Sequence, residues 1–398
     1  MPQNEAKKDI VVIDSPPKGA TLDGEENMAP PRKTLEQEIQ DNAEIIRKKN
    51  IELTEARRSV RALQEALDEV DDVRQKYFQL GAYDPTPPEW LVGKGGSIGS
   101  RGVPICIWSD SHHGEVVKRS GTNDVNEFNK DIAKKRWLRL FDTIVDLCYE
   151  HMGRAKKEYP GIIIPLGGDM VGGDNHEELA RSNDLTPLDA VEDLSDTVCG
   201  GLEHMASKFG KVYVPAVVGN HGRNVKKPPF KDITSFNYDY ALYCLIQKHF
   251  RKDRKYVHID APKSADVHFK SFGTNYMLTH GDNLGVKGGD GIIGAIGPIM
   301  RGSIKLGQQT HKIGLDFDEL ILCHWHQMLW LPGVTVNNTL KGFDEYSALK
   351  LRAPPSRPSQ ALWFNHPEHG TTARWEVFLE DKQAPAVTNR VWASWMEN

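Results

Sequence analysis

The chain has 398 residues, of which 26% are charged and 39% hydrophobic, and its net charge is -5. This balance is typical of a globular protein, and it excludes a wholly disordered chain and a protein that coats nucleic acid through its bulk charge. The five cysteines show no CxxC spacing, which argues against a disulfide framework or a zinc ribbon and favours a reducing compartment. No run reaches the roughly 18 apolar residues of a membrane span, so we expect a cytoplasmic protein with no membrane partner.

Residues 1–33 are rich in Pro, Gly, Asp and Lys and are predicted to be a flexible tail. A long helix is expected over 34–80, and a capping box in which Gln37 reaches back to the amide of Thr34 would begin it. Apolar residues recur along it at intervals of seven: Ile39, Ile46, Leu53, Val60 and Leu67. A helix this long buries too little apolar surface alone, so we predict a coiled coil that forms a homodimer. The alternative is a single helix packed against the rest of its own chain.

The turn-rich residues 81–103 are expected to link this helix to a core domain over 104–381, and residues 382–398 are expected to be a C-terminal tail. In the core, short apolar runs alternate with amphipathic stretches at 125–159 and 187–208. Alternating strands and helices followed by antiparallel runs indicate an α/β layered fold.

Five apolar runs of the core end in residues that can bind metals. In chain order these residues are Asp110 and His112, Asp169, Asn220 and His221, His280, and His324 and His326. Side chains just past the carboxyl ends of strands converge on one crevice in an open α/β sheet. Carboxylates, imidazoles and an amide gathered there can bind divalent metals such as Mn, Fe or Zn, and a carboxylate between two metals can bridge them. Each motif alone is weak evidence for a metal site. The prediction therefore depends on finding all five motifs in this order, each at the end of a predicted strand.

With these motifs, residues 104–381 resemble the calcineurin-like metallophosphoesterase superfamily. The resemblance implies an α/β fold in which a four-layer α-β-β-α sandwich forms the core, preceded here by the long N-terminal helix. It implies two divalent metal ions as cofactors, with manganese expected and iron, zinc, magnesium or nickel as alternatives. The composition is also compatible with a phage-encoded protein of the nuclease-like branch.

The resemblance further implies a role for each motif residue. Asp110, His112 and His326 are expected to bind the first metal, Asn220, His280 and His324 the second, and Asp169 to bridge the two. Two divalent ions make a shared water hydroxide near neutral pH, and His221 is expected to protonate the leaving oxygen or to contact the scissile phosphate.

Two of the motifs depart from the family pattern in the residues beside them. Gly222 and Arg223 follow the GNH motif, where an acid is common, and this removes a possible carboxylate partner of His221. Cys323 stands before the final HxH motif, where Gly is common. Arg223 is the second catalytic candidate because it could hold a phosphate beside His221, although an ordinary solvated arginine is an equally simple interpretation. Other basic residues that could line the rim are Arg119, Arg181, Lys226, Lys227, Arg301 and Lys305.

The expected function is hydrolysis of phosphodiester bonds, with a DNA or RNA nuclease as the leading hypothesis. The segment GDMVGGD at 168–174 lacks the arginine of the protein-phosphatase motif GDxxDRG, which argues against that branch. The alternatives are a phosphomonoesterase or nucleotide hydrolase with the same metal centre and, from another class, a non-catalytic scaffold.

Overall fold

The computed structural model describes residues 34–78, 88–92, 102–152, 159–175, 177–284, 296–351 and 354–381. The chain divides into two compact units, Met1–Val73 and Arg74–Asn398. The tails predicted at 1–33 and 382–398 lie outside the described residues, as does most of the linker predicted at 81–103. Among the helices that are described, none is long and apolar enough to cross a membrane.

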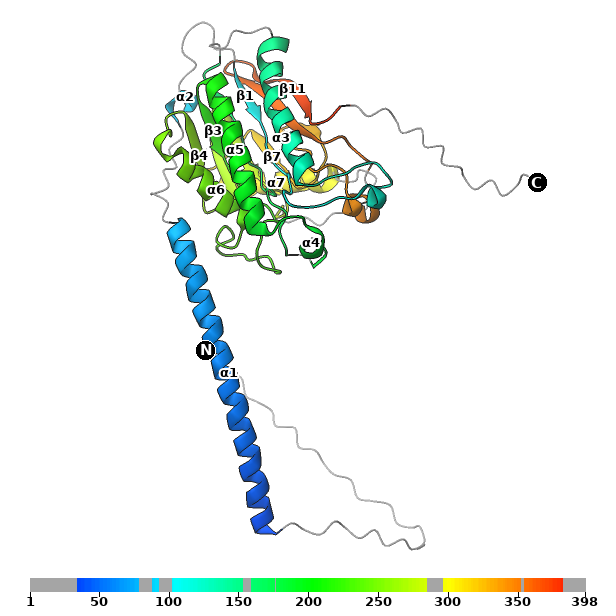
Figure 1. Ribbon diagram of the computed structural model, residues 1–398. Helices are drawn as coiled ribbons and strands as arrows, with labels where there is room; N and C mark the ends of the chain where they lie inside the picture. The colour runs from blue at the N-terminus through cyan, green and yellow to red at the C-terminus, as the bar shows by residue number, and fades with distance from the viewer. Residues whose placement is uncertain are drawn as a thin grey trace, which may run out of the picture. The chain divides into compact units, whose positions relative to one another are not determined.

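Helix α1 (Leu35–Phe78) makes up the described part of the first unit (Figure 1). It begins with the capping box that the sequence predicted. The backbone N–H of Thr34 donates to Gln37 Oε1 over 3.1 Å, and the N–H of Gln37 donates to Thr34 Oγ1 over 3.4 Å. These reciprocal bonds satisfy amides that have no partner within the helix.

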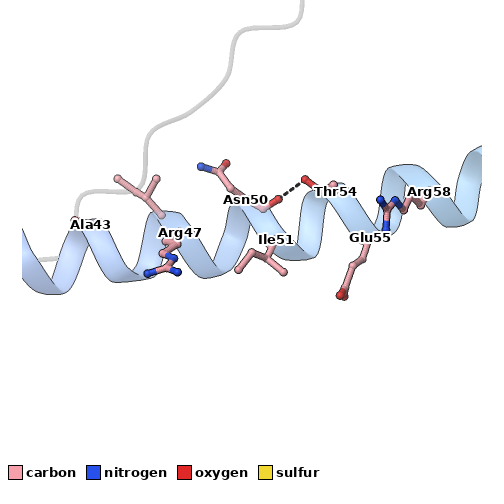
Figure 2. Close-up of a pocket in the computed structure, with 8 residues that line it drawn as sticks. Ala43, Arg47, Asn50, Ile51, Thr54, Glu55 and Arg58 are labelled. Atoms are coloured by element: carbon pink, nitrogen blue, oxygen red, sulfur yellow. Dashed lines mark hydrogen bonds between the residues drawn. The ribbon is translucent and has the colours of Figure 1, made fainter.

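Three apolar residues of the seven-residue repeat on α1 have described side chains, and all three are exposed in the single chain. Ile46, Leu53 and Val60 are 60%, 50% and 57% exposed. Figure 2 shows the neighbouring stretch, where Thr54 Oγ1 donates to the carbonyl oxygen of Asn50 over 2.7 Å. The shallow hollow drawn there is lined, among the described residues, by side chains of α1 alone. It is therefore part of a helix surface and not an enclosed cavity.

We expect full-length Leu53→Asp/Val60→Asp protein to have a lower mass by light scattering than the unmodified protein, because two buried carboxylates would oppose a coiled-coil seam. The matched control is Glu52→Ala/Arg58→Ala, which changes exposed polar positions on the same helix. An unchanged mass for the aspartate variant would contradict the predicted homodimer.

The second unit contains two β-sheets (Figure 1). The six-stranded sheet has the order β11 (Gly370–Phe378), β10 (Ser359–His366), β1 (Val103–Cys106), β2 (Ile162–Ile163), β3 (Val212–Pro215) and β4 (Val257–Asp260). The five-stranded sheet has the order β5 (Asp266–Ser271), β6 (Thr274–Thr279), β7 (Glu319–Leu322), β9 (Val334–Val336) and β8 (Leu329–Leu331). Strands β1 to β4 are parallel, as are β6, β7 and β9. Both sheets are therefore mixed: the parallel strands extend to the β4 edge of the first and form the centre of the second.

The helices of this unit are α2 (Glu89–Val92), α3 (Lys130–Val145), α4 (Glu177–Ser182), α5 (Pro187–Phe209), α6 (Tyr238–His249) and α7 (Ile296–Lys312), with short helical turns η1 (Arg119–Thr122), η2 (Asp146–His151), η3 (Phe250–Lys252) and η4 (Ser347–Leu351). The helix expected at 125–159 begins only at Lys130, where the Asn129 side chain caps it by accepting from Ile132 N–H. The helix expected at 187–208 is observed as α5.

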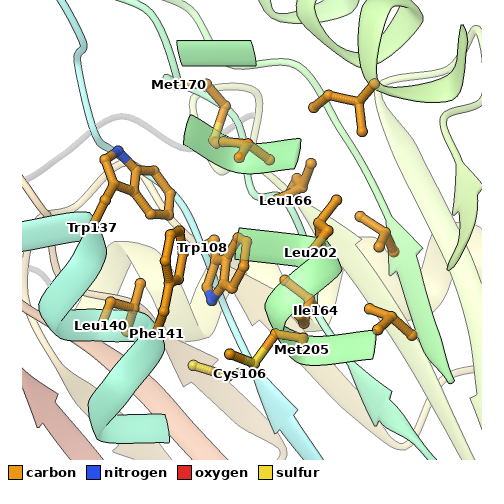
Figure 3. Packing of buried hydrophobic residues seen from close by; sticks show 14 of the residues in the cluster. Cys106, Trp108, Trp137, Leu140, Phe141, Ile164, Leu166, Met170, Leu202 and Met205 are labelled. Atoms are coloured by element: carbon orange, nitrogen blue, oxygen red, sulfur yellow. The ribbon is translucent and has the colours of Figure 1, made fainter. Parts of the chain in front are cut away.

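Three hydrophobic clusters hold the unit together. The largest packs α3, α5 and α6 against one face of the six-stranded sheet, the second lies between the two sheets, and the third packs α7 on the five-stranded sheet. Figure 3 shows Trp108 in the largest cluster, between residues of α3 and α5, with its ring centroid 5.5 Å from that of Trp137 and 5.0 Å from that of Phe141. Trp108 precedes Asp110 by two residues, so this packing fixes the start of the segment that carries Asp110.

Helix α2 contributes to the core although it lies within the predicted linker 81–103. Leu91 is buried in the cluster between the sheets, and its carbonyl oxygen accepts from the N–H of Phe272 over 3.1 Å. The chain thus joins the core domain before residue 104.

Candidate metal centre

The predicted metal ligands follow the carboxyl ends of β1, β2 and β3 in one sheet and of β6 and β7 in the other. Beyond the strands, the backbone continues the parallel contact: Asp110 N–H donates to the carbonyl oxygen of Gly168 over 3.1 Å, and His112 N–H donates to that of Asp169 over 3.0 Å. Because parallel strands end at the same edge of a sheet, side chains distant in sequence are brought together here.

Among the described residues, three groups of side chains have ligand atoms close enough to share an ion. They are Asp110, His112 and His326; Asp169, His280 and His324; and His112, Asp169 and His221. The ligand atoms of each group lie within 4.8 Å of one another. The first group holds the three residues expected to bind the first metal. The second holds Asp169 with two of the residues expected to bind the second metal, and the third group shares His112 with the first and Asp169 with the second.

Five of these residues have a left-handed backbone conformation. The φ angles are 51° for Asp110, 45° for His112, 49° for Asp169, 68° for His324 and 51° for His326. Such conformations cost of order 1–3 kcal/mol each in non-glycine residues and concentrate at functional sites. Asp110 and His112 are therefore not part of an extended strand, since β1 ends at Cys106, although both side chains enter one cluster.

Asp169 belongs to the second group, and its carboxylate also faces His112 of the first group. Its Oδ1 accepts from the N–H of His221 over 2.7 Å. Its Oδ2 lies 3.1 Å from His280 Nε2 and 4.0 Å from His112 Nε2, and this buried oxygen has no hydrogen-bond partner among the described residues. Asn220 Oδ1 lies 3.2 Å from His280 Nε2, so the amide that was expected to complete the second metal site is also present.

Hydrogen bonds fix the orientation of two imidazoles. The Nδ1–H of His280 donates to the carbonyl oxygen of Gly167 over 2.8 Å, and that of His112 donates to Glu115 Oε1 over 2.9 Å. In each case Nε2 is the nitrogen that faces the cluster. An imidazole whose other nitrogen is held by a carbonyl or carboxylate is the usual arrangement of a metal ligand, and the donor set fits divalent transition metals.

The charges of the centre shift its pKa values. Burial and the charge of Lys341 lower the pKa of His112 to about 4, and burial with the charge of His280 lowers that of His324 to about 3. Both rings are therefore neutral, which is the metal-binding form. Burial alone would lower the pKa of His280, but the charge of Asp169 raises it to about 10. Burial alone would raise the pKa of Asp169, yet the charges of His280 and His221 hold it well below its usual range.

Glu115 was missed by the sequence analysis, and it is the carboxylate partner of His221. Glu115 Oε1 accepts from His221 Nδ1 over 3.1 Å as well as from His112. Its Oε2 accepts from the Nζ of the buried Lys341 over 2.8 Å, and Lys341 is also paired with Asp344 at 2.7 Å. Despite burial, these partners raise the pKa of Lys341 and lower that of Glu115. The charged network therefore stays ionised and holds both histidines.

Asp239 was also missed. Its two carboxylate oxygens accept the backbone N–H groups of Asp169, Met170, Val171 and Gly219, at 2.9 to 3.2 Å. One buried side chain in the first turn of α6 thus holds the loop after β2 and the loop after β3. Burial and the nearby Asp169 raise the pKa of Asp239 to about 6.

Asn237 caps α6 beside this carboxylate. Its Oδ1 accepts from Asp239 N–H over 2.8 Å, and its Nδ2 donates to the carbonyl oxygen of Gly219 over 2.7 Å. The sequence signal that would have found the pair is an Asn helix cap two residues before an Asp. For Glu115, the signal is an acid three residues after the DxH histidine. Lys341 has no comparable signal, because it is 226 residues from Glu115 in the chain.

Arg223 lies beside the centre. Its Nε donates to the carbonyl oxygen of Asn220 over 2.8 Å. Its Nη1 is buried and has no hydrogen-bond partner among the described residues. This nitrogen could therefore donate a hydrogen bond to an anionic oxygen. Two other predicted rim residues, Arg119 and Arg181, are exposed side chains, and Arg119 is paired with Glu127 at 3.9 Å.

Three glycines leave room for side chains around the centre. A side chain at Gly167 would collide with Cys323 Sγ, and one at Gly172 would collide with Glu115. A side chain at Gly222 would collide with Asn237 and Asp239. Glu115, the carboxylate bonded to His221, therefore occupies the space left by Gly172.

No protein-family model matches the chain, and no curated protein matches it. Solved structures that are similar include a single mutant of Vps29 from Entamoeba histolytica, at 9% identity over 69% of this chain and 99% of that chain, with a TM-score of 0.27. Vacuolar protein sorting 29 from Cryptosporidium parvum is 13% identical over 69% of this chain and 97% of that chain, with a TM-score of 0.28. The phosphopantetheinyl hydrolase of Mycobacterium tuberculosis is 10% identical over 64% of this chain and 94% of that chain, with a TM-score of 0.27. At these TM-scores none of the likenesses assigns a fold or an activity.

Proposed function

We propose that the chain is a metal-dependent phosphoesterase with two divalent metal ions, of the calcineurin-like metallophosphoesterase type. One observation carries the proposal. Two groups of metal-binding side chains, each with one carboxylate and two imidazoles, lie side by side. Asp169 offers the buried oxygen Oδ2 toward both, and this atom has no hydrogen-bond partner among the described residues. Its distances of 3.1 Å to His280 Nε2 and 4.0 Å to His112 Nε2 place it within reach of a ligand nitrogen of each group, which is the position of a carboxylate shared by two cations.

The residues present fit two ions. Asp110, His112 and His326 would hold the first, Asn220, His280 and His324 the second, and Asp169 would be shared. Manganese is our proposed metal, with iron, zinc, magnesium or nickel as alternatives, because mixed oxygen and imidazole ligands suit all of them. Two such ions would lower the pKa of water and neutralise phosphate oxygens.

His221 is proposed to act on the substrate rather than to bind metal. Its side chain is 24% exposed, whereas those of His112 and Asp169 are 0% and 1% exposed. It therefore lies on the solvent side of the cluster, where a substrate enters. Glu115 holds its Nδ1–H, so the proton for a leaving oxygen would come from Nε2. Arg223 is proposed to direct Nη1 toward a phosphate oxygen.

The finer features of the fold are part of the same proposal. The three hydrophobic clusters support a four-layer α-β-β-α arrangement of the core. The exposed seam of α1 supports a homodimer. All five cysteines are buried free thiols, which supports a reducing compartment such as the cytoplasm.

We propose phosphodiesters, and nucleic acids among them, as the substrate class. The complete ligand set argues against a scaffold that keeps the fold without turnover. A phosphomonoesterase or nucleotide hydrolase would use the same metal centre and is the alternative.

Parallel assays test the proposal. We expect protein loaded with Mn²⁺ to hydrolyse bis-p-nitrophenyl phosphate and labelled DNA faster than p-nitrophenyl phosphate, with two ions per chain by elemental analysis. Protein treated with a chelator is the control and should be inactive on all three. Faster hydrolysis of the monoester would favour the alternative. Inactivity on all three substrates with both ions bound would contradict a phosphoesterase.

A further inference from the structure

A loop emerges directly from the candidate metal centre. It begins after His221 and Arg223 and returns at Asn237, whose side chain holds Gly219. The N–H of Asn224 donates to the carbonyl oxygen of Phe236 over 3.0 Å, and residues 223 and 237 form an antiparallel bridge. The base of the loop is thus fixed to the same backbone that positions Asn220 and His221.

The tip of this loop presents an aromatic ring to solvent. Phe230 is 99% exposed, more than any other large hydrophobic residue in the described part of the chain. Pro228 and Pro229 precede it, and two successive prolines stiffen the backbone in an extended form. The segment that leads back from the tip is anchored, since Ile233 packs against the large hydrophobic cluster and Thr234 is buried. The ring is therefore held outward by a constrained loop and contributes almost nothing to the core.

The loop is also strongly basic. Residues 223–232 contain four basic residues, Arg223, Lys226, Lys227 and Lys231, and one acidic residue, Asp232, whereas the whole chain has a net charge of -5. Lys227 and Lys231 are exposed on either side of Phe230. A basic segment with an outward aromatic ring is the combination that binds single-stranded nucleic acid, because cations contact the phosphates while bases stack on the ring.

We propose that the loop at 224–236, with Phe230 at its tip, is a subsite for single-stranded nucleic acid next to the metal centre. The inference rests on the proposed phosphoesterase function and narrows its substrate class. At about 3.3–3.6 Å per residue, Phe230 reaches no further than about 25 Å from Arg223, so one strand can contact the ring and the centre together. Unpaired bases are required, since a duplex buries the faces that would stack. A protein partner could also use an exposed phenylalanine, but three neighbouring lysines favour a polyanion.

The test measures binding of fluorescent oligothymidylate to the full-length protein in the presence of EDTA, so that no cleavage competes. Phe230→Ala should raise Kd by about 5- to 150-fold, as expected for the loss of one stacked base. Affinity for a duplex of the same length should not change. Lys227→Ala/Lys231→Ala should reduce the slope of log Kd against log salt by about 1.4, because each phosphate contact on a single strand contributes about 0.7.

The controls are Tyr256→Ala, an aromatic residue that is 47% exposed, and Lys248→Ala/Lys252→Ala, at the C-terminal end of α6 and its following turn. These variants should bind oligothymidylate as the unmodified protein does. Equal affinity of Phe230→Ala and the unmodified protein for oligothymidylate would overturn the subsite and would point to a protein contact instead.

A second measurement separates the subsite from the function on which it rests. With Mn²⁺, Phe230→Ala should keep kcat/KM for bis-p-nitrophenyl phosphate, because this small diester has no further nucleotides that could bind along the loop. A parallel loss on this small diester would overturn the subsite, since it would show that Phe230 supports the centre. If the unmodified protein binds oligothymidylate through Phe230 but hydrolyses no diester, the phosphoesterase proposal fails while the binding site stands.

Discussion

Asp169→Asn should abolish turnover of bis-p-nitrophenyl phosphate and reduce the metal content of the protein below two ions per chain. The reason is the position of Oδ2, which lies 3.1 Å from His280 Nε2 and 4.0 Å from His112 Nε2, between the two clusters. An amide would present either a neutral oxygen or an NH₂ group at this point and cannot bridge two cations as a carboxylate does. The bond from His221 N–H to Oδ1 can persist with an amide oxygen, so the loop should keep its conformation.

Asp260→Asn is the matched control for this variant. Asp260 is another buried carboxylate, and it accepts a hydrogen bond from Tyr213 Oη over 2.8 Å outside the metal centre. It should keep its metal content and activity, and thermal unfolding should show that both variants are folded. Near-normal activity of Asp169→Asn would contradict the proposed bridging role.

His221→Ala should lower kcat for the diester by about 10²- to 10⁴-fold, the usual contribution of a general acid, while elemental analysis still finds both ions. This expectation follows from the exposed edge of the ring and from its hydrogen bond to Glu115. His249→Ala is the control, since His249 is paired with Glu203 on the surface at 2.7 Å. Loss of metal together with activity would show that His221 is a ligand within the group that it forms with His112 and Asp169.

Glu115→Gln separates positioning from metal binding. We expect it to cost about 10- to 100-fold in kcat, which is typical of a group that orients an active residue. If Glu115 acts mainly through His221, the same change should cost much less in the His221→Ala background. Glu115 also contacts His112, a proposed metal ligand. A lower metal content of Glu115→Gln would show that this second contact supports metal binding.

Much of the candidate site could be predicted from the sequence for a simple reason. Each predicted ligand directly follows an apolar run, and a parallel sheet places the ends of such runs at one edge. The structure brings together all seven predicted metal-binding side chains. Six of them belong to the three groups described above, and the seventh, Asn220, contacts His280. The same logic located β1, β2, β3, β6 and β7.

The supporting residues could not be predicted in this way. Glu115 and Lys341 meet across 226 positions, and nothing in the local pattern of either segment indicates the contact. Strands β4, β5 and β8 were also missed, because their segments VHID, DVHFKS and LWL hold no run of four apolar residues, and helix α6 was missed as well. The left-handed backbone of Asp110 and His112 was missed for another reason. Propensity argues against φ > 0 in such residues, and only the surrounding contacts impose it.

The carboxylate of Asp239 has a consequence for the order in which the molecule assembles. It joins two loops by four amide hydrogen bonds, and it lies 70 positions from Asp169 and 20 from Gly219. Contacts of such sequence separation form only after the intervening chain has been closed into a loop, at an entropic cost. The loops after β2 and β3 can therefore take their final conformation only when α6 docks. We therefore expect Asp169, Asn220 and His221 to reach their final positions only after α6 has docked.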